Sequence, residues 1–179
     1  SSSTGLVTST LNQLTLTSSE KASNLGFESN MAGWNSGDTP DQISGLRMWL
    51  KADAIVGKND NDTVSTWDDS SGNSNSVTAA VGKEPIYNTG ILNGNPVVSF
   101  NGAGGKSLTN NLNMSTPSTV IYVSRINGAT AGRILSGKNN NWLLGFWSGN
   151  RKVLYAEGWV AAPGGFTPDT NWYMYTATT

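Results

Sequence analysis

Short apolar runs, several of them with an alternation of two residues, recur along the chain from Gly45 onward. The first contains Leu46, Met48 and Leu50, and this spacing is typical of a β-strand with one buried face. Further strands are predicted over residues 64–67, 96–100, 120–123, 133–135, 142–147, 153–156 and 172–176. No segment has the three- and four-residue apolar spacing of an amphipathic helix, so we predict no long helix.

Turn-forming pairs separate these runs. They are Gly72-Asn73, Asn93-Gly94, Asn101-Gly102, Asn127-Gly128 and Gly149-Asn150. Many short strands joined by such turns predict an all-β sandwich or barrel of antiparallel sheets. Residues 120–123 are β-branched and aromatic, which predicts a buried central strand. We expect seven side chains to be largely buried between two antiparallel sheets: Leu46, Met48, Leu50, Val98, Phe100, Ile121 and Val123.

The chain divides by composition near residue 40. Residues 1–40 are rich in Ser and Thr, and Leu11, Leu14 and Leu16 predict one short strand there. This part is either the first strand of the sandwich or an arm that docks on a neighbouring copy. Residues 41–179 form the main domain, and because its last strand ends with the chain, we expect the sandwich to continue beyond residue 179.

Composition excludes several classes of function. The chain has no Cys and no His, so it can hold neither a disulfide nor a Ser-His-Asp triad. Its 11 Lys and Arg nearly balance its 12 Asp and Glu, a surface charge that attracts neither nucleic acid nor anionic lipid. No apolar run has the roughly 20 residues that span a bilayer. A chain rich in Asn, Thr and Gly without Cys is typical of exported bacterial and phage surface proteins.

Four blocks together resemble one family. They cover residues 43–53, 64–73, 92–102 and 171–178, and they are similar to concanavalin A-like, laminin-G-like domains of bacterial or phage surface proteins. The resemblance implies an antiparallel two-sheet jelly-roll sandwich. That fold carries lectins, glycanases, adhesion modules and spacers alike, so it does not by itself define the function. Glycanases of this fold present a Glu-x-Asp-x-x-Glu motif, which is absent here, and we expect no catalytic residues.

Aromatic residues gather between Trp142 and Trp159. A Trp or Tyr ring can stack on the apolar face of a sugar, while Asn and Arg side chains bind its hydroxyls. The alternative is that these rings fill the core. Trp147 and Trp159 lie beside turn residues, which favours their exposure. The predicted ligand-binding residues are Trp147, Trp159, Tyr155, Asn150 and Arg151.

Acidic residues gather between positions 60 and 69. Asp60, Asp62, Asp68 and Asp69 supply the hard oxygen ligands that calcium prefers, although the Gly and distal Glu of an EF-hand are missing. The alternative for Asp69 is an Asx-turn that closes the following Ser-Ser-Gly loop.

Two functions therefore stay open. The first is a non-catalytic, extracellular or cell-surface module that binds a glycan or surface polymer, with calcium as a possible cofactor. The second is a structural building block of a surface appendage, cell-surface layer or virion, whose partners are other copies or other protein subunits. Neither interpretation involves nucleic acid or insertion into a membrane.

Overall fold

The computed structural model describes residues 14–15, 39–115, 117–127, 132–147, 150–156, 159–161 and 170–178. Over these residues the chain is all-β, with antiparallel strand pairs and three 3-10 turns. None of the helical turns found in these ranges is long and apolar enough to cross a bilayer. The chain forms two compact units, the central unit (residues 20–112) and the terminal unit (residues 1–19 and 113–179).

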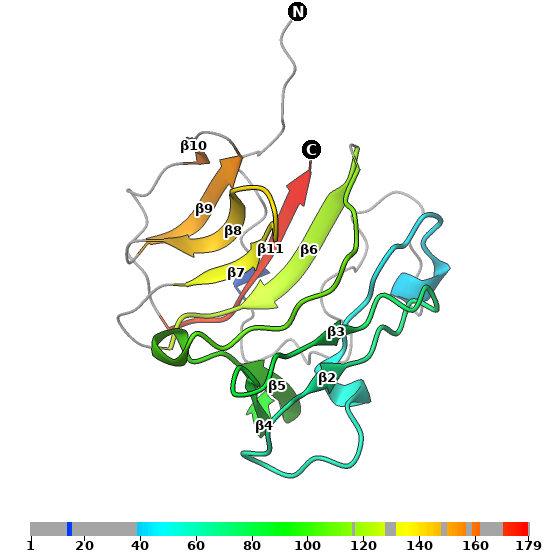
Figure 1. Cartoon of the computed structure of the whole chain (residues 1–179), viewed down its shortest axis with the longest axis vertical. Helices are drawn as coiled ribbons and strands as arrows, with labels where there is room; N and C mark the ends of the chain where they lie inside the picture. Colours follow the sequence, from blue (N-terminus) through cyan, green and yellow to red (C-terminus); the bar gives the residue numbers. More distant parts are fainter. Residues whose placement is uncertain are drawn as a thin grey trace, which may run out of the picture. The chain divides into compact units, whose positions relative to one another are not determined.

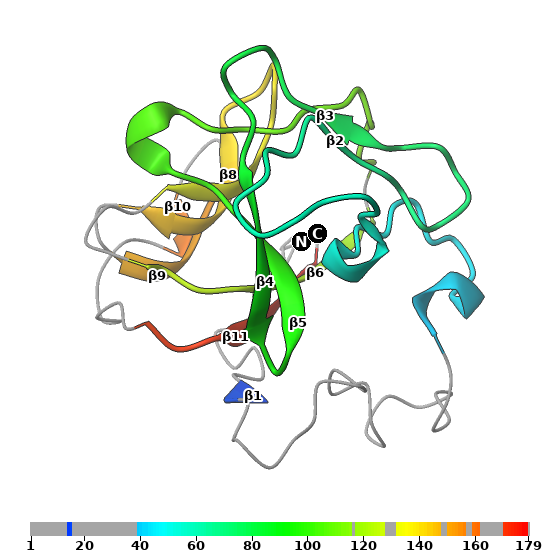
Figure 2. The same cartoon turned by 90° about the horizontal axis from the view of Figure 1, so that it is seen from below.

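The central unit contains two antiparallel strand pairs. Strands β2 (Thr66–Trp67) and β3 (Val77–Thr78) form one pair, and β4 (Ile86–Leu92) and β5 (Asn95–Ser99) form a hairpin (Figure 2). The predicted Asn93-Gly94 turn connects β4 to β5, and both residues have positive φ, 50° and 82°. Two consecutive positive φ angles define the type I′ turn, which Asn-Gly adopts readily. The 3-10 turns η1 (Pro40–Gln42), η2 (Ala52–Ala54) and η3 (Gly102–Gly104) lie in the connecting segments.

The strand predicted around Leu46, Met48 and Leu50 is wrong. Residues 46–49 carry no strand pairing, and Leu50 forms only an isolated bridge with Asp69. The backbone groups here bond to side chains of the loop that follows β2, instead of bonding to a neighbouring strand. Asn73 Nδ2 donates to the Leu46 carbonyl at 2.7 Å, and Asn75 Nδ2 donates to the Arg47 carbonyl at 2.7 Å. The alternation of apolar and polar residues therefore marks an extended segment whose backbone bonds to side chains of a loop and not to a strand.

The predicted core is also largely wrong. Leu46, Met48, Leu50, Val98, Ile121 and Val123 are only half-buried, and Phe100 is 48% exposed. Phe100 follows the last residue of β5, where the strand no longer directs alternate side chains to one face. Among the described residues of the central unit, the buried apolar side chains are instead Val64, Val77 and Tyr87, together with Pro85.

The terminal unit contains a three-stranded sheet in the order β1–β11–β6 (Figure 1). Its strands are β1 (Leu14–Thr15), β11 (Tyr173–Thr178) and β6 (Thr119–Ser124). Along β11 the side chains of Tyr173, Tyr175 and Ala177 are buried and those between them are half-buried. Leu14 of the predicted N-terminal strand pairs with Met174 of the same chain.

Strand β6 was predicted to be central, which is wrong for the described sheet. It pairs only with β11 there. Tyr122 of β6 stacks on the cross-strand Tyr175, with ring centroids 5.1 Å apart. Burial, with a smaller contribution from Tyr175, raises the pKa of Tyr122 above its ordinary value. The aromatic residues therefore stabilise a two-strand contact and do not indicate a central position.

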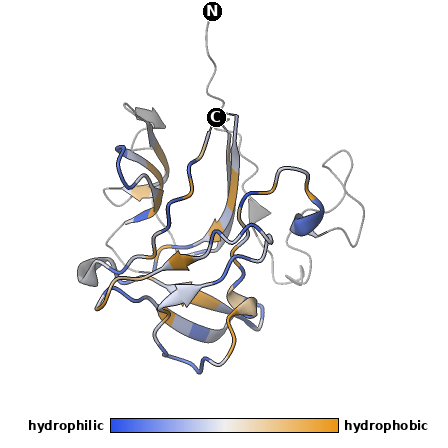
Figure 3. Ribbon diagram, turned by 45° about the vertical axis from the view of Figure 1, so that its right-hand side comes forward, coloured by the Kyte–Doolittle hydropathy of each residue, from blue (hydrophilic) through white to orange (hydrophobic). Residues whose placement is uncertain are grey.

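A four-stranded antiparallel sheet in the order β10–β9–β8–β7 completes the terminal unit (Figure 1). The strands are β7 (Arg133–Ser136), β8 (Trp142–Trp147), β9 (Asn150–Ala156) and β10 (Trp159–Ala161). Figure 3 shows hydrophobic and hydrophilic residues following one another along the described strands. The prediction of an all-β, antiparallel fold is confirmed, and the jelly-roll arrangement stays a prediction.

Candidate functional site

The sheet of β7, β8 and β9 places one Trp at the surface. Along β8, Leu143, Leu144 and Phe146 are buried, whereas Trp147 at the end of the strand is 39% exposed. The predicted exposure of Trp147 is therefore confirmed. A Trp at the end of a strand presents part of its ring to solvent, where the ring can stack on a ligand.

The strand register of the sheet shifts on both sides of Gly145. On one side the register between β7 and β8 shifts between Arg133 and Leu135, and on the other the register between β8 and β9 shifts between Gly145 and Trp147. Gly145 has φ +120°, and a Cβ there would come within 2.6 Å of Cγ1 of Ile134. Only glycine accommodates both the backbone angle and this close approach. The bulged sheet therefore depends on Gly145.

Arg133 lies over the ring of Trp147, with its guanidinium carbon 5.4 Å from the ring centroid. The guanidinium also donates to Asn141 Oδ1 at 3.1 Å and to the Trp142 carbonyl at 3.4 Å. These acceptors hold the cation beside the ring, and both Arg133 and Asn141 are exposed. The arrangement combines a flat apolar face, fixed N–H donors and a positive charge, which together suit an oxygen-rich ligand.

The structure places the other predicted ligand-binding residues on the same sheet. Asn150 pairs with Trp147, and Arg151 is the next residue of β9. Tyr155 is half-buried and pairs with Leu143 on one side and with Trp159 on the other. The side chains of Asn150, Arg151 and Trp159 lie outside the described residues.

Trp142 contributes to the structure of this sheet, not to its surface. Its side chain is half-buried and lies against Gly137, where an added Cβ would come within 2.5 Å of the indole Nε1. The sequence prediction chose Trp147 over Trp142 because Trp147 lies beside turn residues, and the exposure of the two side chains agrees with that choice. It did not reveal Arg133 as the neighbour of Trp147, since the register of β7 decides that contact.

The acidic residues divide between two places in the central unit. Asp60 Oδ1 accepts from the Thr89 N–H at 2.9 Å, a bond that lowers the pKa of Asp60, and Asp62 Oδ2 accepts from the Asn59 N–H at 2.7 Å. Asp68 is exposed and accepts only a 3.3 Å bond from the Ser76 hydroxyl. In the part of the chain that the structure describes, no three acidic side chains gather as a metal site would require.

Asp69 accepts hydrogen bonds from three separate parts of its surroundings. Its Oδ1 accepts from the backbone N–H groups of Trp49 and Ser71 at 2.8 and 2.9 Å, and its Oδ2 accepts from the Asn75 N–H at 2.9 Å. Burial raises the pKa of Asp69, but these N–H bonds lower it further, so the pKa lies below its ordinary value. The bond to Ser71, two residues later, is the predicted Asx-turn.

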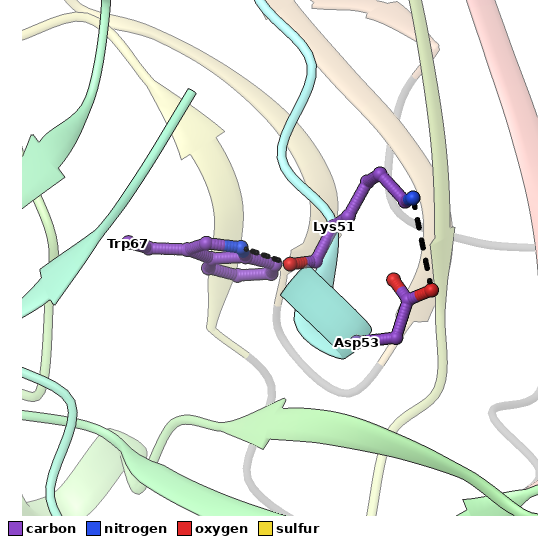
Figure 4. A network of polar contacts seen from close by, with 3 residues as sticks. All are labelled: Lys51, Asp53 and Trp67. Atoms are coloured by element: carbon purple, nitrogen blue, oxygen red, sulfur yellow. Dashed lines mark hydrogen bonds and ion pairs between the residues drawn. The ribbon is translucent and has the colours of Figure 1, made fainter. Parts of the chain in front are cut away.

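A second aromatic group surrounds Lys51 (Figure 4). The indole Nε1 of Trp67 donates to the Lys51 carbonyl at 2.8 Å, and the Lys51 ammonium lies 3.8 Å from the Asp53 carboxylate. The same ammonium stands 4.9 Å from the ring centroid of Trp49. Trp49 and Trp67 are half-buried, so this group connects residues 49–53 with β2 and offers less free aromatic surface than Trp147.

No protein-family model, curated protein or solved structure matches the chain. A functional assignment for this chain therefore depends on the geometry described above.

Proposed function

We propose that this chain is a non-catalytic, extracellular module that binds a glycan or another surface polymer through the end of the β7–β8–β9 sheet. One observation carries the proposal: Trp147 is exposed while its neighbours in β8 are buried, and Arg133 and Asn141 provide polar groups beside it. The finer fold proposed with it is the concanavalin A-like, laminin-G-like jelly-roll sandwich. The proposed location is the cell surface or, alternatively, the surface of a virion.

The chemistry of the exposed ring supports this function. The C–H face of a pyranose is apolar and matches an indole ring, while its hydroxyl groups need donors and acceptors at the edge. Stacking on one exposed aromatic ring contributes roughly 0.5–1.5 kcal/mol, so a single site binds weakly. Useful attachment then requires several copies acting on one polymer, which raises the effective affinity without any new contact.

The absence of His and Cys from the sequence agrees with a binding role. The chain has no His and no Cys, the residues that most often act as general base or activated nucleophile. Glu157, the one acidic residue between Trp142 and Trp159 in the sequence, lies outside the described residues.

Trp147→Ala tests the proposal, with retention on immobilised polysaccharides and thermal unfolding as the two readouts. Because Trp147 is exposed, we expect stability to fall by only about 1 kcal/mol, mainly from the lost cation–π contact, while retention is lost. Trp172→Ala is the matched control, since Trp172 also lies under an arginine, with the Arg125 guanidinium carbon 4.9 Å from its ring centroid, but it is half-buried. This control should lower stability and leave retention of the folded protein unchanged.

The opposite pattern would refute the proposal. If Trp147→Ala unfolds the chain without a specific effect on retention, the ring serves packing, and the structural building block becomes the better function. Analytical ultracentrifugation of the wild-type chain would then test for contacts between copies.

A further inference from the structure

The chain as a whole is nearly neutral, but its two units have net charges of opposite sign. Residues 20–112 contain six Lys and Arg against ten Asp and Glu, a net charge of −4. Residues 113–179 contain five Lys and Arg against two Asp and Glu, a net charge of +3, and residues 1–19 contain no charged side chain. Electrostatic attraction acts over roughly a Debye length of 8–10 Å, so a ligand responds to the local charge and not to the total.

The positive charge is concentrated on the sheet that carries Trp147. Residues 133–156, which form β7, β8 and β9 with their connections, contain no Asp or Glu. The same residues contain four of the five cations of the terminal unit, namely Arg133, Lys138, Arg151 and Lys152.

Strand register places cationic residues on both of the strands that flank β8. Arg133 of β7 pairs with Gly145 of β8, and Gly145 pairs with Val153 of β9, so the three residues form one row across the sheet. Asn150 pairs with Trp147, and the two cationic residues Arg151 and Lys152 occupy β9 between Asn150 and Val153. Neighbouring strands lie about 4.8 Å apart, which places cationic positions on β7 and β9 within about two strand spacings of each other, on either side of β8.

We infer that the polymer bound at Trp147 is an acidic polysaccharide, whose carboxylate or sulfate groups lie on Arg133 while a sugar ring stacks on the indole. The inference rests on the proposed function and names the class of its ligand. Arg133 suits the role because its planar fork matches the two oxygens of an acidic group, and its bonds to Asn141 and Trp142 already orient it beside the ring.

Two pairs of polymers test the inference on the full chain, because each pair differs only in its acidic groups. The first pair is dextran sulfate and dextran, and the second is polygalacturonate and its methyl ester. We expect retention on the acidic member of at least one pair, about tenfold weaker retention on its neutral partner, and elution as salt screens the charges. Retention on dextran sulfate alone identifies sulfate as the recognised group, and retention on polygalacturonate alone identifies carboxylate.

Arg133→Gln, which removes one exposed charge beside the ring, should weaken retention on the acidic polymer roughly two- to fivefold. Arg125→Gln is the matched control, because it removes the same charge from an arginine that also lies over a Trp, but one outside residues 133–156. Unchanged thermal unfolding of Arg133→Gln would show that its effect on retention does not come from misfolding.

The outcomes separate the inference from the proposed function. Equal retention on the acidic and neutral members, insensitive to salt and lost in Trp147→Ala, would overturn the acidic ligand and keep the glycan-binding function. No retention on any polymer would overturn both. Tighter retention on single-stranded DNA than on either acidic polysaccharide would overturn the polysaccharide as ligand, because a cationic sheet with an exposed ring can also stack bases.

Discussion

Replacing Gly145 by alanine probes the feature that positions the candidate site. Gly145 has φ +120°, and the added methyl group would meet Ile134 at 2.6 Å from Cγ1, 2.9 Å from Cβ and 3.0 Å from its backbone nitrogen. The side-chain atoms could move by rotation, but the nitrogen belongs to β7, which pairs with β8 at this point. The substitution therefore forces either the backbone of β8 or the strand pair itself to shift.

The magnitude follows from two separate costs. A residue other than glycine held at an unfavourable φ costs of order 1–3 kcal/mol. Overpacking against atoms that cannot retreat costs typically a further 1–3 kcal/mol. We therefore expect Gly145→Ala to lower the free energy of unfolding by about 2–5 kcal/mol, a large part of the stability of an ordinary domain.

Urea unfolding monitored by circular dichroism measures this loss, and Gly132→Ala is its control. Gly132 precedes β7, has no atom within 4 Å of an added Cβ, and does not have a positive φ of the kind found at Gly145. Alanine there should be neutral or should stabilise by up to about 1 kcal/mol, because it restricts the unfolded chain. If both variants were as stable as the wild type, the close approach of β8 to Ile134 would not require glycine at position 145.

Three further predictions concern polar side chains. Asp69→Asn should lower the free energy of unfolding by roughly 2–4 kcal/mol, because several N–H donors lose a charged acceptor, whereas Asp68→Asn should stay within about 0.5 kcal/mol. Since the pKa of Asp69 is lowered in the folded chain, its stabilisation is complete above the ordinary carboxyl pKa and is lost as pH falls through the lower folded pKa. Urea titrations of wild type and Asp69→Asn should therefore begin to converge as pH falls below the ordinary carboxyl pKa of about 4. Ser124→Ala should keep or raise the melting temperature, because the buried Ser124 hydroxyl has no hydrogen-bond partner among the described residues; a clear fall would reveal a partner. Calcium should leave the melting temperature unchanged, and a calcium-dependent rise reversed by EDTA would instead establish the metal site predicted around Asp60.

Local chemistry made part of the fold predictable from sequence. The Asn93-Gly94 pair identified its turn because its backbone angles are intrinsic to those two residues. The limits of β8 were predicted as residues 142–147, and the structure gives the same limits, because turn residues flank an unbroken apolar run. The isolated glycine in this strand suggested a bulge at Gly145, and the structure has register shifts beside it, with the extra residues on β7 and β9.

The incorrect structural predictions concern segments whose conformation depends on residues far away in the sequence. Leu46, Met48 and Leu50 alternate like a strand, yet side chains some 20 to 28 residues further along the chain bond to this segment. Alternating apolar and polar residues indicate an extended backbone. They do not indicate whether the backbone N–H and C=O groups bond to another strand or to side chains. The contact between Arg133 and Trp147 was missed for the same reason, because strand register and not sequence distance brings them together.

Asp69 shows why an acidic sequence is a poor guide to a metal. A carboxylate supplies the same two oxygens to a calcium ion or to converging N–H groups, so residue type alone cannot separate these uses. What separates them is the number of donors already in place, and at Asp69 the backbone N–H groups of Trp49, Ser71 and Asn75 occupy both oxygens. Two of the four blocks that resemble laminin-G-like domains, residues 43–53 and 64–73, meet through these bonds. The Trp-Asp-Asp-Ser-Ser-Gly-Asn sequence therefore has a structural role here, because its loop takes the place of the strand partner that residues 46–50 lack.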